Sequence, residues 1–129
     1  MQKEKCKVED GEPVEIAGRT YRFALRVVTL CRHLDARPGV KRTLSGQLLR
    51  SGTSVGANVE EAQAAYSRAD FACKMGIALK EARETRYWLR ILSDSDLVPS
   101  DLLAPLLAEA TEIMKVVGSI TSKARRPVP

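Results

Sequence analysis

Aromatic residues are scarce in this sequence: they make up 5% of its 129 residues, although apolar residues together reach 44%. The strands of a β-sandwich need aromatic and β-branched side chains, so this scarcity disfavours that class and favours helices. Histidine occurs once, and the three cysteines, Cys6, Cys31 and Cys73, contain no CxxC pair. A disulfide framework or a structural zinc site is therefore not expected, and reduced thiols suit the cytoplasm.

Long apolar runs are missing too. No window approaches the roughly 20 apolar residues that a membrane-spanning helix needs, and the start, MQKEKCKVEDGEP, lacks the apolar core of a signal peptide. We therefore expect a cytoplasmic protein with no membrane partner. The length predicts one domain. We expect a flexible polar leader over residues 1–18, a helical domain over 19–122 and a basic, proline-rich tail over 123–129.

Acidic residues are outnumbered, and the distribution of charge is more informative than the net value of +5. Residues 19–93 hold fourteen Lys or Arg and six acidic residues, a net +8, whereas residues 94–122 carry −4. Arginine outnumbers lysine thirteen to eight, which suits bidentate contacts with phosphate or carboxylate groups. The middle of the chain is thus expected to present a basic surface.

Apolar residues recur at spacings of three and four along most of the chain, which predicts an all-α fold. The first helix is expected over residues 19–36, before a stop signal at Pro38 and Gly39. The second should cover residues 44–66, and the third should span 67–92, opened by a capping box of Ser67 and Asp70. The fourth should follow residue 100.

The apolar stripes of these helices predict the core. They are Tyr21, Ala24, Val28 and Cys31 in the first helix, with Leu25, Val27 and Leu34 beside them; Leu44, Leu48, Ser51, Val55, Val59, Ala62 and Tyr66 in the second; Phe71, Met75, Ala78, Ala82, Thr85, Leu89 and Leu92 in the third; and Leu103, Leu106, Ala110, Ile113, Val117 and Ile120 in the fourth. The third helix has a second apolar patch, formed by Cys73, Ile77, Trp88 and Ile91. A single bundle buries one stripe per helix, so this patch predicts an interface with another subunit.

Basic residues gather on two of the helices. On the first, the members lie within about 60° of one another on a helical projection, away from the predicted apolar stripe. They are Arg19, Arg22, Arg26, His33 and Arg37. The third helix adds Arg83, Arg86 and Arg90 on one side, with Lys80 somewhat apart. Both groups are candidate phosphate ligands; the alternative is that they are solvated faces, partly neutralised by neighbouring acidic residues.

The segment RSGTSVGANVEEA, residues 50–62, contains two glycines among hydroxyl groups, as a phosphate-binding loop does. A Walker loop needs Lys and Ser/Thr after its second glycine, but Ala57 and Asn58 follow Gly56 here. The flanking residues form helices well, so a helix is predicted instead. Gly52 and Gly56 then share one flank and allow a second helix to approach closely, which offsets the helix propensity that glycine loses.

On the opposite flank of that helix, Ser51, Ser54 and Asn58 form a polar group. If they are buried, they need hydrogen-bond partners on neighbouring helices. The alternative is that they face water.

The core SVGANVEE, in which Ser54, Gly56, Asn58 and Glu61 stand, followed by ALKEARETRYWL, closely resembles a known signature. It is similar to that of the bacterial four-helix-bundle family encoded in intervening sequences of large-subunit ribosomal RNA genes. That family is similar in turn to the accessory variability proteins of diversity-generating retroelements. The resemblance implies an up-down-up-down four-helix bundle that assembles as a ring-like homopentamer. For the retroelement relatives it implies a basic surface that binds nucleic acid and the reverse transcriptase.

Catalysis is not expected from this sequence. A di-iron bundle needs paired Glu and E-x-x-H motifs, and the single histidine, His33, is predicted on the solvent-facing stripe. No catalytic residues, cofactor or metal are therefore predicted. Glu60, Glu61, Glu81 and Glu84 are expected to pair with nearby arginines.

The sequence favours a non-catalytic, basic, homo-oligomeric accessory or scaffold protein that binds RNA or DNA backbone, or a ribonucleoprotein such as a ribosomal component or a reverse transcriptase. Contacts with phosphates would make such binding weakly sequence-specific. The alternative is an adaptor that binds only protein, with its arginines directed at acidic protein surfaces.

Overall fold

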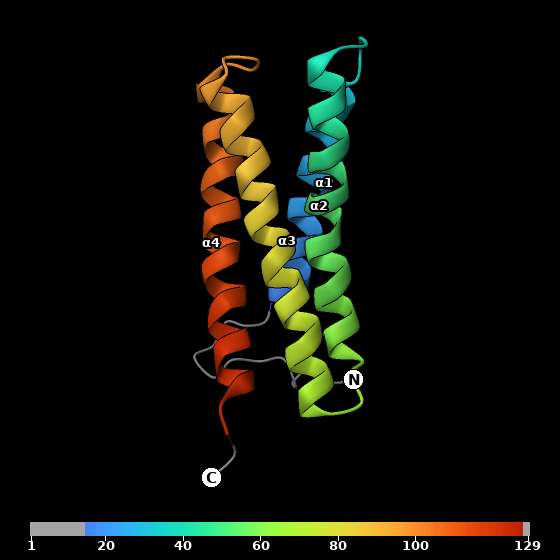
Figure 1. Ribbon diagram of the computed structural model, residues 1–129, viewed down its shortest axis with the longest axis vertical. Helices are drawn as coiled ribbons and strands as arrows, with labels where there is room; N and C mark the ends of the chain where they lie inside the picture. Colours follow the sequence, from blue (N-terminus) through green and yellow to red (C-terminus); the bar gives the residue numbers. More distant parts are fainter. Residues whose placement is uncertain (1–14, 128–129) are drawn as a thin grey trace.

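The structure is a computed structural model, and it describes residues 15–127. Four helices run antiparallel to their neighbours in sequence: α1 (Ile16–Leu34), α2 (Val40–Gln63), α3 (Arg68–Asp94) and α4 (Ser100–Arg125). Figure 1 shows them side by side along one long axis, joined by short turns at alternating ends. The all-α four-helix bundle predicted from the sequence is confirmed. None of these helices is long and apolar enough to cross a membrane.

Of the four interfaces between neighbouring helices, one is much smaller than the others. α2 packs closely on α1 and α3, and α3 packs closely on α4, whereas α1 and α4 contact each other much less. The core runs along the whole bundle axis and draws on every helix.

The helical domain begins earlier and ends later in the sequence than predicted. α1 begins at Ile16 rather than at residue 19, because the Ile16 side chain is buried in the core. α4 continues to Arg125, so the start of the predicted tail is helical. The predicted leader up to residue 14, together with residues 128–129, lies outside the described residues.

The buried stripe of α1 differs from the predicted one. Tyr21 and Leu25 are 59% and 50% exposed, and Ala24 and Val28 are half-buried. The residues that α1 buries are Ile16, Thr20, Phe23, Val27, Cys31 and Leu34. Two apolar arcs run along this helix, and the arc that includes Val27 fits against small residues of α2, as described below. The arc that includes Tyr21 is left on the surface.

The predicted stripes of the other helices largely hold. In α3 every member from Met75 onwards is buried, while Phe71 is half-buried and Ala72 takes its place in the core. In α4 the stripe is buried as far as Val117. Tyr66 was placed on the buried arc of the second helix, but α2 ends at Gln63 and the tyrosine side chain is 99% exposed.

The N-terminus of α3 is capped as predicted. Ser67 Oγ accepts a hydrogen bond of 3.0 Å from the Asp70 backbone N–H. Asp70 Oδ2 in turn accepts the backbone N–H of Tyr66 at 3.1 Å, which lowers the pKa of the Asp70 carboxyl. These bonds satisfy donors that the first helical turn leaves without partners.

Candidate nucleic-acid interface

The small-residue segment of α2 is helical and packs tightly on α1. A Cβ added to Gly52 would lie 2.8 Å from Val27 Cγ1, and one added to Gly56 would lie 3.3 Å from the carbonyl oxygen of Thr20. The prediction of close helix approach is confirmed. The two glycines therefore serve packing, and the segment is not a phosphate cradle.

The polar group on the other flank of α2 is only partly interhelical. Ser51 is buried, and its Oγ accepts a 3.0 Å hydrogen bond from Thr85 Oγ1 of α3. Ser54 and Asn58 are half-buried and donate to carbonyl oxygens of their own helix, at 2.7 and 2.9 Å. The expectation of partners on neighbouring helices was right for Ser51 and wrong for the other two, because the carbonyl four residues earlier is sufficient. Glu61, the last residue of the signature, is exposed.

The first basic residue of α1 is already engaged. Arg19 Nε and Nη2 donate to Glu109 Oε2 and Oε1 of α4 at 2.7 and 2.8 Å, a bidentate ion pair. The Arg19 hydrogen bonds lower the pKa of the Glu109 carboxyl. This pair joins the two helices that otherwise contact each other least. Arg19 therefore differs from the free, solvent-facing ligand that the sequence suggested.

The other members of the predicted α1 stripe have different surroundings. Arg22 and Arg26 are exposed, but they lie close enough to Glu109 to lower the pKa of its carboxyl further. Arg37 is not on α1 at all, because the helix ends at Leu34. It lies in the turn before α2, where it lines a surface hollow with His33. The five residues thus do not form one continuous row of free cations.

The basic residues of α3 are more accessible. Arg83 and Arg90 are exposed, and neither forms an ion pair within residues 15–127. Arg86 is half-buried, and its Nε donates to Thr111 Oγ1 of α4 at 3.2 Å. All three lie on the flank of α3 that faces α4, as their helical spacing requires.

The two basic groups lie on different sides of α4. Arg19 of α1 contacts Glu109, and Arg86 of α3 contacts Thr111. Two residues along a helix correspond to about 200° of rotation, so these two partners point to opposite sides of α4. The α1 group therefore lies on the α1–α4 side of the bundle and the α3 group on the α3–α4 side. Sequence reasoning could not show this, because it depends on which helices are neighbours.

The two glutamates of α3, Glu81 and Glu84, lie on the flank that faces α2, opposite Arg83, Arg86 and Arg90. Arg50 of α2 forms ion pairs with Glu81 at 3.2 Å and with Glu84. The predicted pairing with arginines is confirmed for Glu81 and Glu84. It is wrong for Glu60 and Glu61, which are exposed and form no ion pair within residues 15–127. Glu84 also accepts a 3.0 Å hydrogen bond from Trp88 Nε1. Arg50 was not among the residues singled out from the sequence. Its position on α2, level with the two glutamates of α3, is the feature that could have predicted these ion pairs.

The patch predicted as a subunit interface lies on the surface of this chain. Cys73 is exposed, Ile77 is 36% exposed, and Trp88 and Ile91 are half-buried. Tyr87, at 53% exposed, packs edge-to-face on Trp88 with ring centroids 5.1 Å apart. A second apolar surface, formed by Tyr21 and Leu25 of α1, was not expected.

The described part of the chain offers few side chains for catalysis or metal binding. Cys31 is buried, and burial raises the pKa of its thiol, so a reactive thiolate is disfavoured. Among residues 15–127, no group of three or more His, Cys, Asp or Glu side chains is arranged to hold a metal ion.

Comparison with known proteins identifies the family of this chain. The sequence profile of a family described as 23S rRNA-intervening sequence protein matches residues 12–119. The chain belongs to this family. It is also similar to a crystal structure of a protein of unknown function from the S23 ribosomal protein family of Bacteroides thetaiotaomicron. The two chains are 42% identical, with a TM-score of 0.76 over 82% of this chain and 97% of the other. A comparison with curated proteins gave no match.

Proposed function

We propose that this member of the 23S rRNA-intervening sequence family is a non-catalytic accessory or scaffold protein that binds nucleic acid or a ribonucleoprotein through phosphate groups. The observation that supports this most is the pair of exposed arginines, Arg83 and Arg90, which form no ion pair in residues 15–127. An arginine fork matches phosphate geometry, and arginines held on one helix can engage one backbone together.

The chemistry of this surface supports affinity rather than sequence recognition. Contacts with phosphates position a protein on nucleic acid but carry no sequence information. Two of the seven residues predicted as ligands, Arg19 and Arg86, are held by partners on α4 and are better regarded as positioning residues. Of the others, Arg22 and Arg26 act on the Glu109 carboxyl, whereas Arg83 and Arg90 are exposed and form no ion pair within residues 15–127. The expected phosphate ligands are therefore Arg83 and Arg90.

Self-association belongs to this proposal. The partly exposed patch of Ile77, Trp88 and Ile91 is available for contact with a second copy, and the resemblance noted above predicts a homopentameric ring. Repeating a modest basic surface around a ring would create a multivalent site, which raises avidity without any new contact.

Two biological partners are proposed, one from the family description and one from the signature. The family's connection with 23S rRNA intervening sequences favours a ribosomal RNA or ribosomal particle. The resemblance to accessory variability proteins predicts a reverse transcriptase complex instead. Purification of each particle and measurement of co-sedimentation with the protein distinguish these two partners.

Fluorescence anisotropy tests the proposal directly. The full chain should bind labelled RNA and DNA with an affinity that falls steeply between 50 and 200 mM salt, because phosphate contacts release counterions. An unrelated protein of equal net charge is the control. Binding no tighter than that of the control would contradict the proposed function.

The exposed apolar surfaces favour one alternative, an adaptor that binds only protein. Tyr21 and Leu25 of α1 are largely exposed among the described residues, on a face of the bundle that no other described helix covers. An adaptor should show no salt-dependent binding of nucleic acid, yet should retain a specific protein after nuclease treatment. The anisotropy measurement therefore separates the two hypotheses.

A further inference from the structure

Between Gly76 and Arg90, one flank of α3 carries basic side chains and no acidic ones. The positions of α3 that point toward α4 and outward are 76, 79, 80, 83, 86, 87 and 90 on a helical projection. Four of them are basic, Lys80, Arg83, Arg86 and Arg90, and none is acidic. The next position on this flank is Asp94, the last residue of α3, which lies near Arg90. The acidic residues between the ends of α3, Glu81 and Glu84, both turn toward Arg50 of α2. The helix is thus divided lengthwise by charge.

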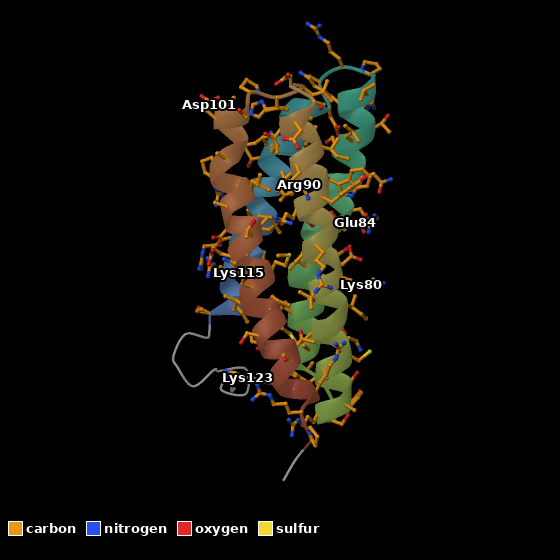
Figure 2. The ribbon with its side chains drawn as sticks, turned by 60° about the vertical axis from the view of Figure 1, so that its left-hand side comes forward. Lys80, Glu84, Arg90, Asp101, Lys115 and Lys123 are labelled. Atoms are coloured by element: carbon orange, nitrogen blue, oxygen red, sulfur yellow. The ribbon has the colours of Figure 1, made fainter. Side chains whose placement is uncertain are left out.

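α4 extends this basic flank. The Arg125 guanidinium lies beside Gly76, since a Cβ added there would meet its Nη2 at 2.5 Å. Near the start of α3, Arg68 donates to the carbonyl oxygens of Lys123 and Ala124, both at 3.0 Å. Figure 2 labels Lys80, Glu84 and Arg90 along α3, and Lys115 and Lys123 along α4. We call the resulting surface the α3–α4 basic face, and its members are Arg68, Lys80, Arg83, Arg86, Arg90, Lys115 and Arg125.

The α1–α4 side offers a poorer site for an anion. Glu109 lies there and is paired with Arg19. Arg22 and Arg26 are near enough to this carboxylate to lower its pKa. Glu112 contributes a further negative charge that acts on Arg19. A phosphate that approached Arg22 or Arg26 would therefore meet the paired Glu109 carboxylate. Arg83 and Arg90 form no ion pair within residues 15–127, although Asp94 lies near Arg90 at the end of α3.

The α3–α4 basic face is long, straight and poor in aromatic groups. Arg68 and Arg90 are 22 residues apart on one helix, which corresponds to about 33 Å. One turn of a nucleic-acid duplex has a similar length, about 34–36 Å. Single strands are held by aromatic side chains on which the bases stack. This face has one exposed aromatic residue, Tyr87.

We propose that the α3–α4 basic face, and not α1, binds the phosphate backbone of duplex nucleic acid. This inference rests on the proposed function and specifies its surface and its ligand class. Arg83 and Arg90 make the main phosphate contacts. Lys80 adds a charge on α3, and Lys115 of α4 is paired with Glu112 at 3.5 Å. Arg86 acts by holding the face in place through its bond to Thr111.

Two double variants of the full chain test this inference. Arg83→Gln with Arg90→Gln removes two charges from the basic face, and Arg22→Gln with Arg26→Gln removes two charges from α1. Both variants have the same net charge, so a non-specific charge effect is matched. Light scattering and circular dichroism establish that each retains the parent's assembly and helicity.

The probes are a 20-base-pair RNA duplex, the DNA duplex of the same sequence and one unstructured single strand. For the duplexes, loss of two phosphate contacts should make the log–log salt slope shallower by about 1.8. The affinity ratio between 50 and 200 mM salt should then fall by about tenfold for the α3 variant and stay unchanged for the α1 variant. RNA and DNA duplexes that respond alike would identify the backbone as the shared ligand.

Three results would overturn the inference while the proposed function stands: equal losses in both variants, a larger loss in the α1 variant, or a single strand bound as tightly by the parent as a duplex. If the parent binds none of the probes, the proposed function itself fails.

Discussion

At the scale of single residues, the glycines of α2 show how strongly one contact can constrain a position. Gly46 and Gly52 are both helical, but a Cβ at Gly46 would meet nothing within 4 Å, whereas one at Gly52 would clash with both methyl groups of Val27. Val27 is buried and β-branched, so its side chain cannot turn aside easily. The same substitution should therefore lower the stability of the fold at one position and raise it at the other.

We predict that Gly52→Ala destabilises the fold by about 1 kcal/mol, because crowding of the core exceeds the gain in helix propensity. Gly46→Ala is the matched control and should stabilise by about 0.5–1 kcal/mol. Urea unfolding followed by circular dichroism measures both. A higher midpoint for Gly52→Ala than for the parent would show that the contact with Val27 is not tight.

The Arg19–Glu109 pair should make stability depend on pH. Its hydrogen bonds lower the pKa of Glu109 in the folded protein, so the pair's contribution is fully present above the ordinary glutamate pKa of about 4.3. It is lost as the pH falls through the lower, folded value. We predict that Glu109→Gln is less stable than the parent at pH 7 and that this difference narrows below about pH 4.

Free energies of unfolding measured between pH 3 and pH 7 test this dependence. Glu60→Gln is a suitable control, because Glu60 is exposed and forms no ion pair in the described residues. A difference between Glu109→Gln and the parent that stays constant over the whole range would rule out a role for the carboxylate charge.

At the scale of elements, α3 organises the molecule. It packs on both α2 and α4, its arginines and glutamates occupy opposite flanks, and its first turn has a side-chain cap. The predicted stripe from Met75 onwards, the Ser67 cap and the ion pairs of Glu81 and Glu84 agree with the structure. Helical spacing fixes these features locally, so they could be inferred from the sequence.

We predict that Ser67→Ala costs about 1 kcal/mol of stability, because the Asp70 N–H loses its acceptor at the start of α3. Ser122→Ala, at an exposed position near the end of α4, serves as the control. Thermal and urea unfolding compare the two. Equal stability of the variants would mean that water replaces the cap without cost.

At the scale of the whole molecule, the bundle presents faces of different chemistry. The α3–α4 face is basic, the α2–α3 side carries the Arg50–Glu81–Glu84 ion pairs beside Trp88, and α1 leaves Tyr21 and Leu25 exposed. A protein that associates with itself and with a polyanion needs this separation, because an apolar contact and a basic surface cannot share one area.

We predict that the parent forms oligomers at micromolar concentration and that Ile77→Glu dissociates them, because a charge would enter the predicted apolar contact. Tyr66→Glu adds the same charge at a side chain that is 99% exposed and should leave the assembly unchanged. Light scattering measures both variants. A monomeric parent would disprove self-association, and an unaffected Ile77→Glu oligomer would exclude this patch as the interface.

The sequence by itself determined the helical class, the number of helices, the α3 cap and the helical nature of the glycine segment, because each depends on spacing within one stretch of chain. It did not determine which face of α1 is buried, because the face that contains Tyr21 and the face that contains Val27 are similarly apolar. The choice required a partner surface: Gly52 and Gly56 admit Val27 and the Thr20 backbone. With α1 in this orientation, Arg19 faces Glu109 of α4. The basic residues of α1 therefore lie on a different side of the bundle from those of α3. Local periodicity sets which residues share a face, but only packing between helices decides what that face meets.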